Sequence, residues 1–93
     1  MYITIEKIND YLGTESLKIG QELILIKDVD NYYDDEAIKV LTINNATCGY
    51  VSNSTETVAR GTHSAGYIYK DIKNNQKCII SFILNDCVIA RLI

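Results

Sequence analysis

The chain has no apolar run that approaches the roughly 20 residues needed to cross a bilayer. Its longest apolar stretches, such as residues 23–26, are far shorter. The opening segment, residues 1–7, has no basic start followed by an apolar stretch, so it does not resemble a signal peptide. We therefore expect a cytoplasmic protein without a membrane partner.

Cysteine is scarce and occurs in an odd number. Cys48, Cys78 and Cys87 show no Cys-x-x-Cys spacing, which argues against both a disulfide framework and a thiolate zinc site. Because each lies in apolar, strand-like sequence, we expect three buried, reduced core residues and no metal.

Residues with catalytic patterns are also few. His63 is the only histidine, and the chain has neither a Gly-x-Ser-x-Gly motif nor a glycine-rich phosphate loop. We expect His63 in an exposed loop between two helices, and we expect neither an enzyme nor a cofactor.

The acidic run over residues 28–36 invites two further interpretations. It lacks the glycine and the terminal glutamate of a calcium loop at the required spacing. Asp34 and Asp35 are adjacent, so on a strand their side chains point to opposite faces rather than toward one substrate. Hydrolysis at this pair remains an alternative, as does an ordinary solvated acidic turn.

The charge is small and uneven. The net charge is −3, with nine acids against four lysines in residues 1–40 and three acids against five basic residues in 41–93. The acidic first half would repel a polyanion, which excludes strong non-specific DNA binding driven by counterion release.

At 93 residues and 47% hydrophobic content, the chain is expected to form one domain, residues 1–93, around one core. Abundant Ile, Leu, Val, Tyr and Thr favour β-structure. The pattern predicts a first strand from Tyr2 that Ile8 extends, a central strand over 23–26 buried on both faces, and strands over 37–43, 47–51, 77–84 and 87–93.

Turns and helices complete this prediction. Asn44-Asn45 suits a tight hairpin turn, and Asn85-Asp86 suits a two-residue hairpin turn that places Cys78 opposite Ile93. Gly49 indicates a bulge or a close backbone approach. Asn53 and Glu56 resemble a capping box for a short helix over 54–60, and Ser64 caps a second helix that buries Ala65, Ile68 and Ile72. The expected fold is mainly β with two short helices.

The aromatic residues are almost all tyrosine. Seven Tyr and one Phe, without Trp, provide rings that pack in a core or stack on bases. Packing is the favoured role of Tyr2, Tyr67 and Tyr69. Tyr32, Tyr33 and Tyr50 flank turns and strand ends, where packing and binding are evenly matched.

The segment around these tyrosines resembles the HIRAN family, which includes domains of helicase-like DNA-repair translocases and free-standing bacterial proteins. The resemblance rests on Gly20, strand 23–26, Asp28, Asn31, Tyr33-Asp34, Ala37-Ile38-Lys39-Val40 and Gly49-Tyr50-Val51. It extends from about Ile3 to the C-terminus and is most specific over 20–51. It implies a small OB-like β-barrel with a pair of helices.

The resemblance also implies a function. Known HIRAN domains bind the 3′ end of single-stranded DNA, which assigns base stacking to Tyr33 and Tyr50, acceptance of the 3′-hydroxyl to Asp34, and a further contact to Tyr11. The resemblance implies a helicase-like translocase as protein partner. Tyr32 replaces the usual proline, and Tyr50 and Asn53 replace a histidine and a lysine of the relatives. Tyr11 matches an Arg-Tyr pair of the relatives only loosely and has no arginine beside it. The lost cations motivate an alternative, a protein-interaction or regulatory barrel without DNA binding.

Overall fold

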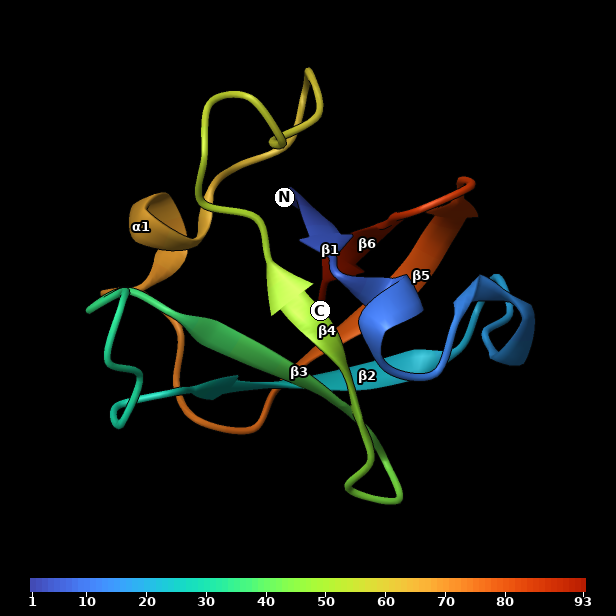
Figure 1. Ribbon diagram of the computed structural model, residues 1–93, viewed down its shortest axis with the longest axis horizontal. Helices are drawn as coiled ribbons and strands as arrows, with labels where there is room; N and C mark the ends of the chain where they lie inside the picture. The colour runs from blue at the N-terminus through green and yellow to red at the C-terminus, as the bar shows by residue number, and fades with distance from the viewer.

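The computed structural model describes residues 1–93, which form a closed antiparallel barrel of six strands. Around the barrel the order is β1-β4-β3-β2-β5-β6, and β1 closes it by pairing with both β4 and β6 (Figure 1). The strands are β1 (Tyr2–Glu6), β2 (Glu22–Lys27), β3 (Ile38–Thr42), β4 (Thr47–Val51), β5 (Gln76–Ile83) and β6 (Val88–Leu92). The predicted class, a mainly β, OB-like small barrel, is confirmed.

Alternate side chains of β2, β3 and β5 fill the barrel interior, whereas β1 and β6 each bury three consecutive residues. Leu23 and Leu25 on β2 are fully buried, whereas Ile24 and Ile26 are only half-buried. The prediction that this strand is buried on both faces is therefore wrong. A closed barrel has one interior, and no helix layer covers the outer face of β2, so its apolar run is buried on one side only.

The hairpin turns follow the sequence pattern, but the strand register does not follow it throughout. Asn45 adopts a positive φ of 69° in the β3–β4 turn, as expected for an Asn-Asn hairpin. On β5–β6 the register shifts between Ile80 and Phe82, so Cys78 pairs with Leu92 rather than with Ile93. The predicted pairing is wrong because a bulge inserts one residue into β5.

Gly49 marks the close backbone approach that the sequence suggested. A Cβ atom at this position would lie 2.5 Å from the backbone oxygen of Glu6, so only glycine lets the end of β1 lie against β4. Lys7, the residue after Glu6, has a φ of 63° and turns the chain into a 3₁₀ helix, Ile8–Asp10. Ile8 therefore does not extend the strand, and that expectation is wrong.

Of the two predicted helices, the one over residues 54–60 is absent and the one capped by Ser64 is present. Residues 54–60 form turns instead of the expected helix. The Asn53 side chain, the predicted cap, bonds to Asp34 and Gly66, and Ser54 Oγ accepts the Glu56 N–H at 3.2 Å in its place. Ser64 caps α1 (Ala65–Ile68) by accepting a hydrogen bond from the Tyr67 backbone N–H at 3.2 Å. Besides α1 and the 3₁₀ helix at 8–10, the structure has one further 3₁₀ helix, Thr14–Ser16, and none of its helices is long and apolar enough to cross a membrane.

The cysteines and the histidine correct two further expectations. Cys48 and Cys78 are buried, but Cys87 is only half-buried, because it lies in the β5–β6 turn. Burial raises the pKa of the Cys48 thiol to about 11 and that of Cys78 to about 12. His63 is half-buried rather than exposed, since its backbone N–H donates to the Tyr2 carbonyl at 2.8 Å and ties residue 63 to β1.

Candidate functional site

The segment between β2 and β3, residues 28–37, is held in place by side chains that bond to its own backbone. Asn31 Oδ1 accepts hydrogen bonds from the backbone N–H groups of Tyr33 and Asp34, both at 2.9 Å. Asp34 Oδ1 in turn accepts from the Glu36 N–H at 2.9 Å. Such bonds explain why the segment forms a defined turn rather than a longer strand.

Asn53, just after β4, joins this segment to α1. Its amide nitrogen lies 3.4 Å from Asp34 Oδ2 and 3.3 Å from Glu36 Oε1, and its amide oxygen accepts from the Gly66 N–H at 2.7 Å. Segment 28–37 and α1 consequently lie on the same side of the barrel (Figure 1). Asn53 thus fixes the position of the Asp34 carboxylate from outside the turn.

Tyr50, on β4, is anchored to the same segment. Its hydroxyl donates to Asp28 Oδ2 at 3.0 Å, and its ring lies 6.3 Å from that of Tyr11 at an interplanar angle of 43°. Burial, followed by the hydrogen bond to the Asp28 carboxylate, raises the pKa of Tyr50 to about 12. The phenol therefore stays neutral and keeps a fixed orientation.

These residues surround one pocket of about 250 Å³, here called the tyrosine pocket. Its lining comprises Glu6, Lys7, Tyr11, Asn31, Tyr33, Asp34, Ala37, Tyr50, Val51 and Asn53. All four site residues expected from the sequence are included, although they come from three separate parts of the chain. The barrel brings them together because the ends of β1, β2 and β4 meet at this rim.

Tyr32 and Asp35, which are adjacent in sequence to Tyr33 and Asp34, lie outside the lining of the tyrosine pocket. Tyr33 is 92% exposed, and Tyr32, at 89%, contacts it edge-on with ring centroids 5.2 Å apart but does not line the pocket. Asp35 is exposed and also lies outside the lining. Asp34 and Asp35 therefore do not converge on the pocket.

Sequence reasoning missed the cation of the site. The Lys7 ammonium lies 5.8 Å from the centre of the Tyr50 ring and lines the pocket. A lysine in an expected continuous strand gave no sign of this role, because the φ of 63° at Lys7 redirects the chain. Asn31 and Asn53 were missed as positioning residues, although an asparagine ahead of Tyr-Tyr-Asp is typical of an Asx turn.

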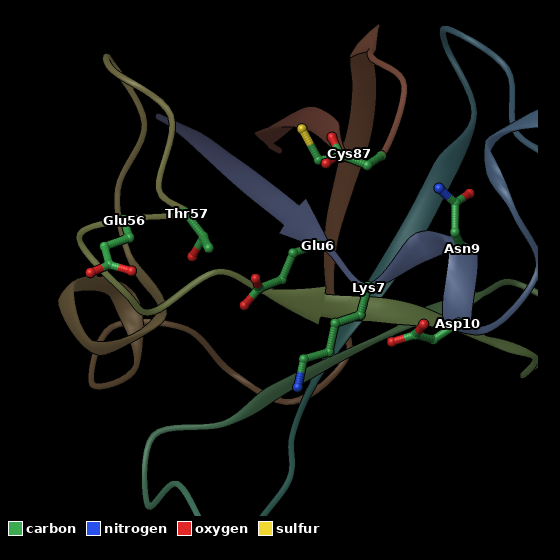
Figure 2. A pocket seen from close by; sticks show the side chains of 8 residues that line it. Glu6, Lys7, Asn9, Asp10, Glu56, Thr57 and Cys87 are labelled. Atoms are coloured by element: carbon green, nitrogen blue, oxygen red, sulfur yellow. The ribbon is translucent and has the colours of Figure 1, made fainter.

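A second pocket of about 430 Å³ adjoins the tyrosine pocket and shares Glu6 and Lys7 with it. Figure 2 shows Glu6 and Lys7 at the end of β1, Glu56 on the loop after β4, and Cys87 at the β5–β6 turn. With Asp10 and Asp86, the lining of this pocket contains four carboxylates and one lysine. We call it the acidic pocket. No group of three or more His, Cys, Asp or Glu residues is placed to share a metal ion.

The comparisons with solved structures identify the fold. The chain is similar to the HIRAN domain of human HLTF, with 20% identity and a TM-score of 0.70 over 99% of this chain and 71% of that one. It is also similar to a protein from Lactobacillus plantarum, with 19% identity and a TM-score of 0.61 over 98% and 90% of the two chains. No protein-family model and no curated protein matches the sequence.

The barrel is thus a HIRAN-like fold, as the sequence resemblance predicted. The similarity extends over almost the whole chain, including the strand ends that form the tyrosine pocket.

Proposed function

We propose that residues 1–93 act as a single non-catalytic, nucleic-acid-binding module that holds the 3′ end of single-stranded DNA in the tyrosine pocket. The observation that carries this proposal is the convergence of Tyr11, Tyr33, Asp34 and Tyr50 on one pocket. Stacking rings beside an acceptor for a hydroxyl match the chemistry of a nucleotide with a free 3′-hydroxyl.

Asp34 reads the terminal hydroxyl in this proposal. Its Oδ1 already accepts the Glu36 N–H, whereas Oδ2 has only the 3.4 Å contact from the Asn53 amide. The carboxylate therefore keeps lone pairs for an incoming hydroxyl, and its negative charge repels a 3′-phosphate. Discrimination between the two ends follows from this single group.

The aromatic rings bind the bases. Tyr33 is highly exposed and offers an open face, while the hydrogen bond from Tyr50 to Asp28 holds the second ring in place. Tyr11, tilted against Tyr50, supplies a further contact. Because stacking tolerates every base, the module binds with little sequence preference.

Tyr50 and Asn53 carry no positive charge where the relatives have a histidine and a lysine. In this proposal Lys7 supplies the contact to a DNA phosphate instead. It is the only cation that lines the tyrosine pocket, and Glu6 beside it partly offsets its charge. Affinity is therefore modest, and it depends only weakly on salt, with a slope of log affinity against log salt of about −0.7 for one phosphate contact on a single strand.

The test measures fluorescence anisotropy with oligonucleotides that end in a 3′-hydroxyl or a 3′-phosphate, at low salt. The protein should prefer the hydroxyl. Asp34→Asn should lose most of that preference, because a hydrogen bond to a charged acceptor contributes about 1.5–3 kcal/mol. Asp35→Asn is the matched control: it removes the same charge one residue away, outside the pocket lining, and should keep the preference.

Two results would contradict the proposal. One is the absence of binding to either oligonucleotide at low salt. The other is an end preference that survives Asp34→Asn.

A second candidate, a protein-interaction barrel, is supported by an apolar pocket of about 280 Å³ at the β1–β6 side. Phe82 and Leu84 there are 58% and 49% exposed, and Arg60 is the only charged residue in the lining. The fitting partner is a protein segment that presents an apolar side chain next to a carboxylate. A helicase-like translocase in the cytoplasm, where the free thiols stay reduced, is the proposed source.

Co-purification from the native cell tests this candidate. Phe82→Glu should abolish recovery of the protein partner, whereas Asp34→Asn should leave recovery intact. Recovery of nucleic acid alone would exclude it.

A further inference from the structure

We infer that a DNA strand held in the tyrosine pocket continues from its 3′ end across Asn53 into a fourth pocket, where Tyr67 stacks a base and Arg60 contacts a phosphate. This inference rests on the proposed function and adds the direction of the strand and a second binding subsite. The fourth pocket, here called the Tyr67 pocket, has a volume of about 460 Å³. Its lining comprises Asn53, Thr55, Val58, Ala59, Arg60, Gly61, Thr62, His63, Ser64 and Tyr67.

A strand needs more room than the tyrosine pocket offers. OB-type folds engage about 4–16 nucleotides of single-stranded nucleic acid, whereas the tyrosine pocket measures about 250 Å³, less than the roughly 300–1,000 Å³ of common small-molecule sites. The remaining nucleotides must therefore leave through one of the two adjoining pockets.

Charge separates the two exits. The acidic pocket shares Glu6 and Lys7 with the tyrosine pocket and carries four carboxylates against one lysine. The Tyr67 pocket shares Asn53 with the tyrosine pocket, contains Arg60, and has no acidic residue in its lining. A phosphate backbone is repelled by the first pocket and attracted by the second.

Tyr67 is placed as a stacking surface rather than as a core residue. Tyr67 is 60% exposed, and its ring is stacked on that of His63, with centroids 4.3 Å apart and an interplanar angle of 19°. His63 is fixed through its bond to the Tyr2 carbonyl, and the Tyr67 backbone is fixed by the Ser64 cap. One face of the Tyr67 ring is thus supported, and the other is free to receive a base.

Asn53 sets the two subsites next to each other. Its amide nitrogen contacts Asp34, and its amide oxygen holds the N–H of Gly66, the residue before Tyr67. One side chain therefore bridges Asp34, the group that reads the terminal hydroxyl, and α1, the helix that carries Tyr67. The path across Asn53 is short, and the Glu36 carboxylate, 3.3 Å from the Asn53 amide nitrogen, is the one acidic group beside it apart from Asp34.

The test compares a trinucleotide and a nonanucleotide of thymidine, both with free 3′-hydroxyl ends, bound to the full chain. We expect the longer strand to bind more tightly. Tyr67→Ala should reduce the gain in affinity with length by at least about fivefold, the lower limit for loss of one stacked base. Tyr67→Phe keeps the ring and should retain the gain.

Arg60→Gln tests the phosphate contact with the nonanucleotide. It should lower the slope of log affinity against log salt by about 0.7, the value for one phosphate contact on a single strand. Lys70→Gln is the matched control, because Lys70 is an exposed cation that lines none of the pockets.

The outcomes separate this inference from the proposed function. If both oligonucleotides bind and Asp34→Asn weakens that binding, but Tyr67→Ala leaves the gain with length intact, the strand path is wrong and end recognition stands. If Glu56→Gln increases the gain in affinity with length and Arg60→Gln leaves it unchanged, the strand passes through the acidic pocket. That result would also overturn the inference. Absence of binding to both oligonucleotides removes both ideas.

Discussion

The barrel and segment 28–37 are stabilised by different interactions. In the barrel, strand ladders and fully buried side chains such as Leu25 and Ile38 hold the chain. In the segment, Asn31, Asp34 and Asn53 bond to backbone and side-chain groups near the surface. The comparison predicts that stability and the proposed binding depend on separate sets of residues, so each can be changed with limited effect on the other.

The largest expected effect breaks the barrel. Leu25→Ala removes a fully buried side chain and should lower the free energy of unfolding by about 2–5 kcal/mol. Ile24→Ala, on the same strand but half-buried, is the control and should cost clearly less. Urea denaturation measures both. Equal losses for the two variants would show that the outer face of β2 is covered in solution.

An intermediate effect is expected when the segment is broken and the barrel is kept. Asn31→Ala leaves the N–H groups of Tyr33 and Asp34 without their side-chain acceptor. Because these groups are near solvent, stability should fall by only about 1 kcal/mol, whereas binding of the 3′-hydroxyl oligonucleotide should weaken by a larger amount. Denaturation and anisotropy on the same sample measure the two effects.

Asn31→Asp is the matched variant, because it keeps an oxygen acceptor at this position and should retain more of the binding. A loss of stability without a loss of binding in Asn31→Ala would refute the separation of fold from site.

The strands could be predicted because their signals are local. Alternating or continuous Ile, Leu and Val mark β2 and β3, and Asn44-Asn45 marks the turn between β3 and β4. The bulge on β5 could not be predicted, since it depends on how the sheet closes. The helix expected over 54–60 failed for a related reason: a capping-box spacing was present, but Asn53 makes its bonds to Asp34 and Gly66, which are distant in sequence.

The site was only partly predictable. Asp34 and Tyr33 were found through a family resemblance, not through their physical properties. Lys7 and the His63–Tyr67 pair depend on backbone geometry at Lys7 and on the bridge between residue 63 and β1. No short sequence pattern encodes these contacts.

The smallest expected effect is a dependence of stability on pH, which tests how Tyr50 is held in the wall of the tyrosine pocket. Burial and the Asp28 hydrogen bond raise the pKa of folded Tyr50 to about 12, above its usual value of 10. The folded state thus favours the protonated phenol; the stability this contributes is fully present below pH about 10 and is lost as the pH rises toward about 12.

Tyrosinate absorbance, compared between the natural chain and Tyr50→Phe, isolates this titration. Asp28→Asn should shift it to lower pH, because it removes the nearby negative charge. An unchanged titration in Asp28→Asn would show that the two side chains do not bond in solution.

The pairing of β1 with β6 has a kinetic consequence. This contact joins Ile3 to Ala90 and Ile5 to Val88, so the barrel closes only when residues from opposite ends of the chain meet. Contacts of such high sequence separation slow folding, and all-β topologies commonly fold in milliseconds to seconds. We expect closure of this seam to contribute to the rate-limiting step, so that substitutions in the short loops alter the folding rate less than substitutions along the seam.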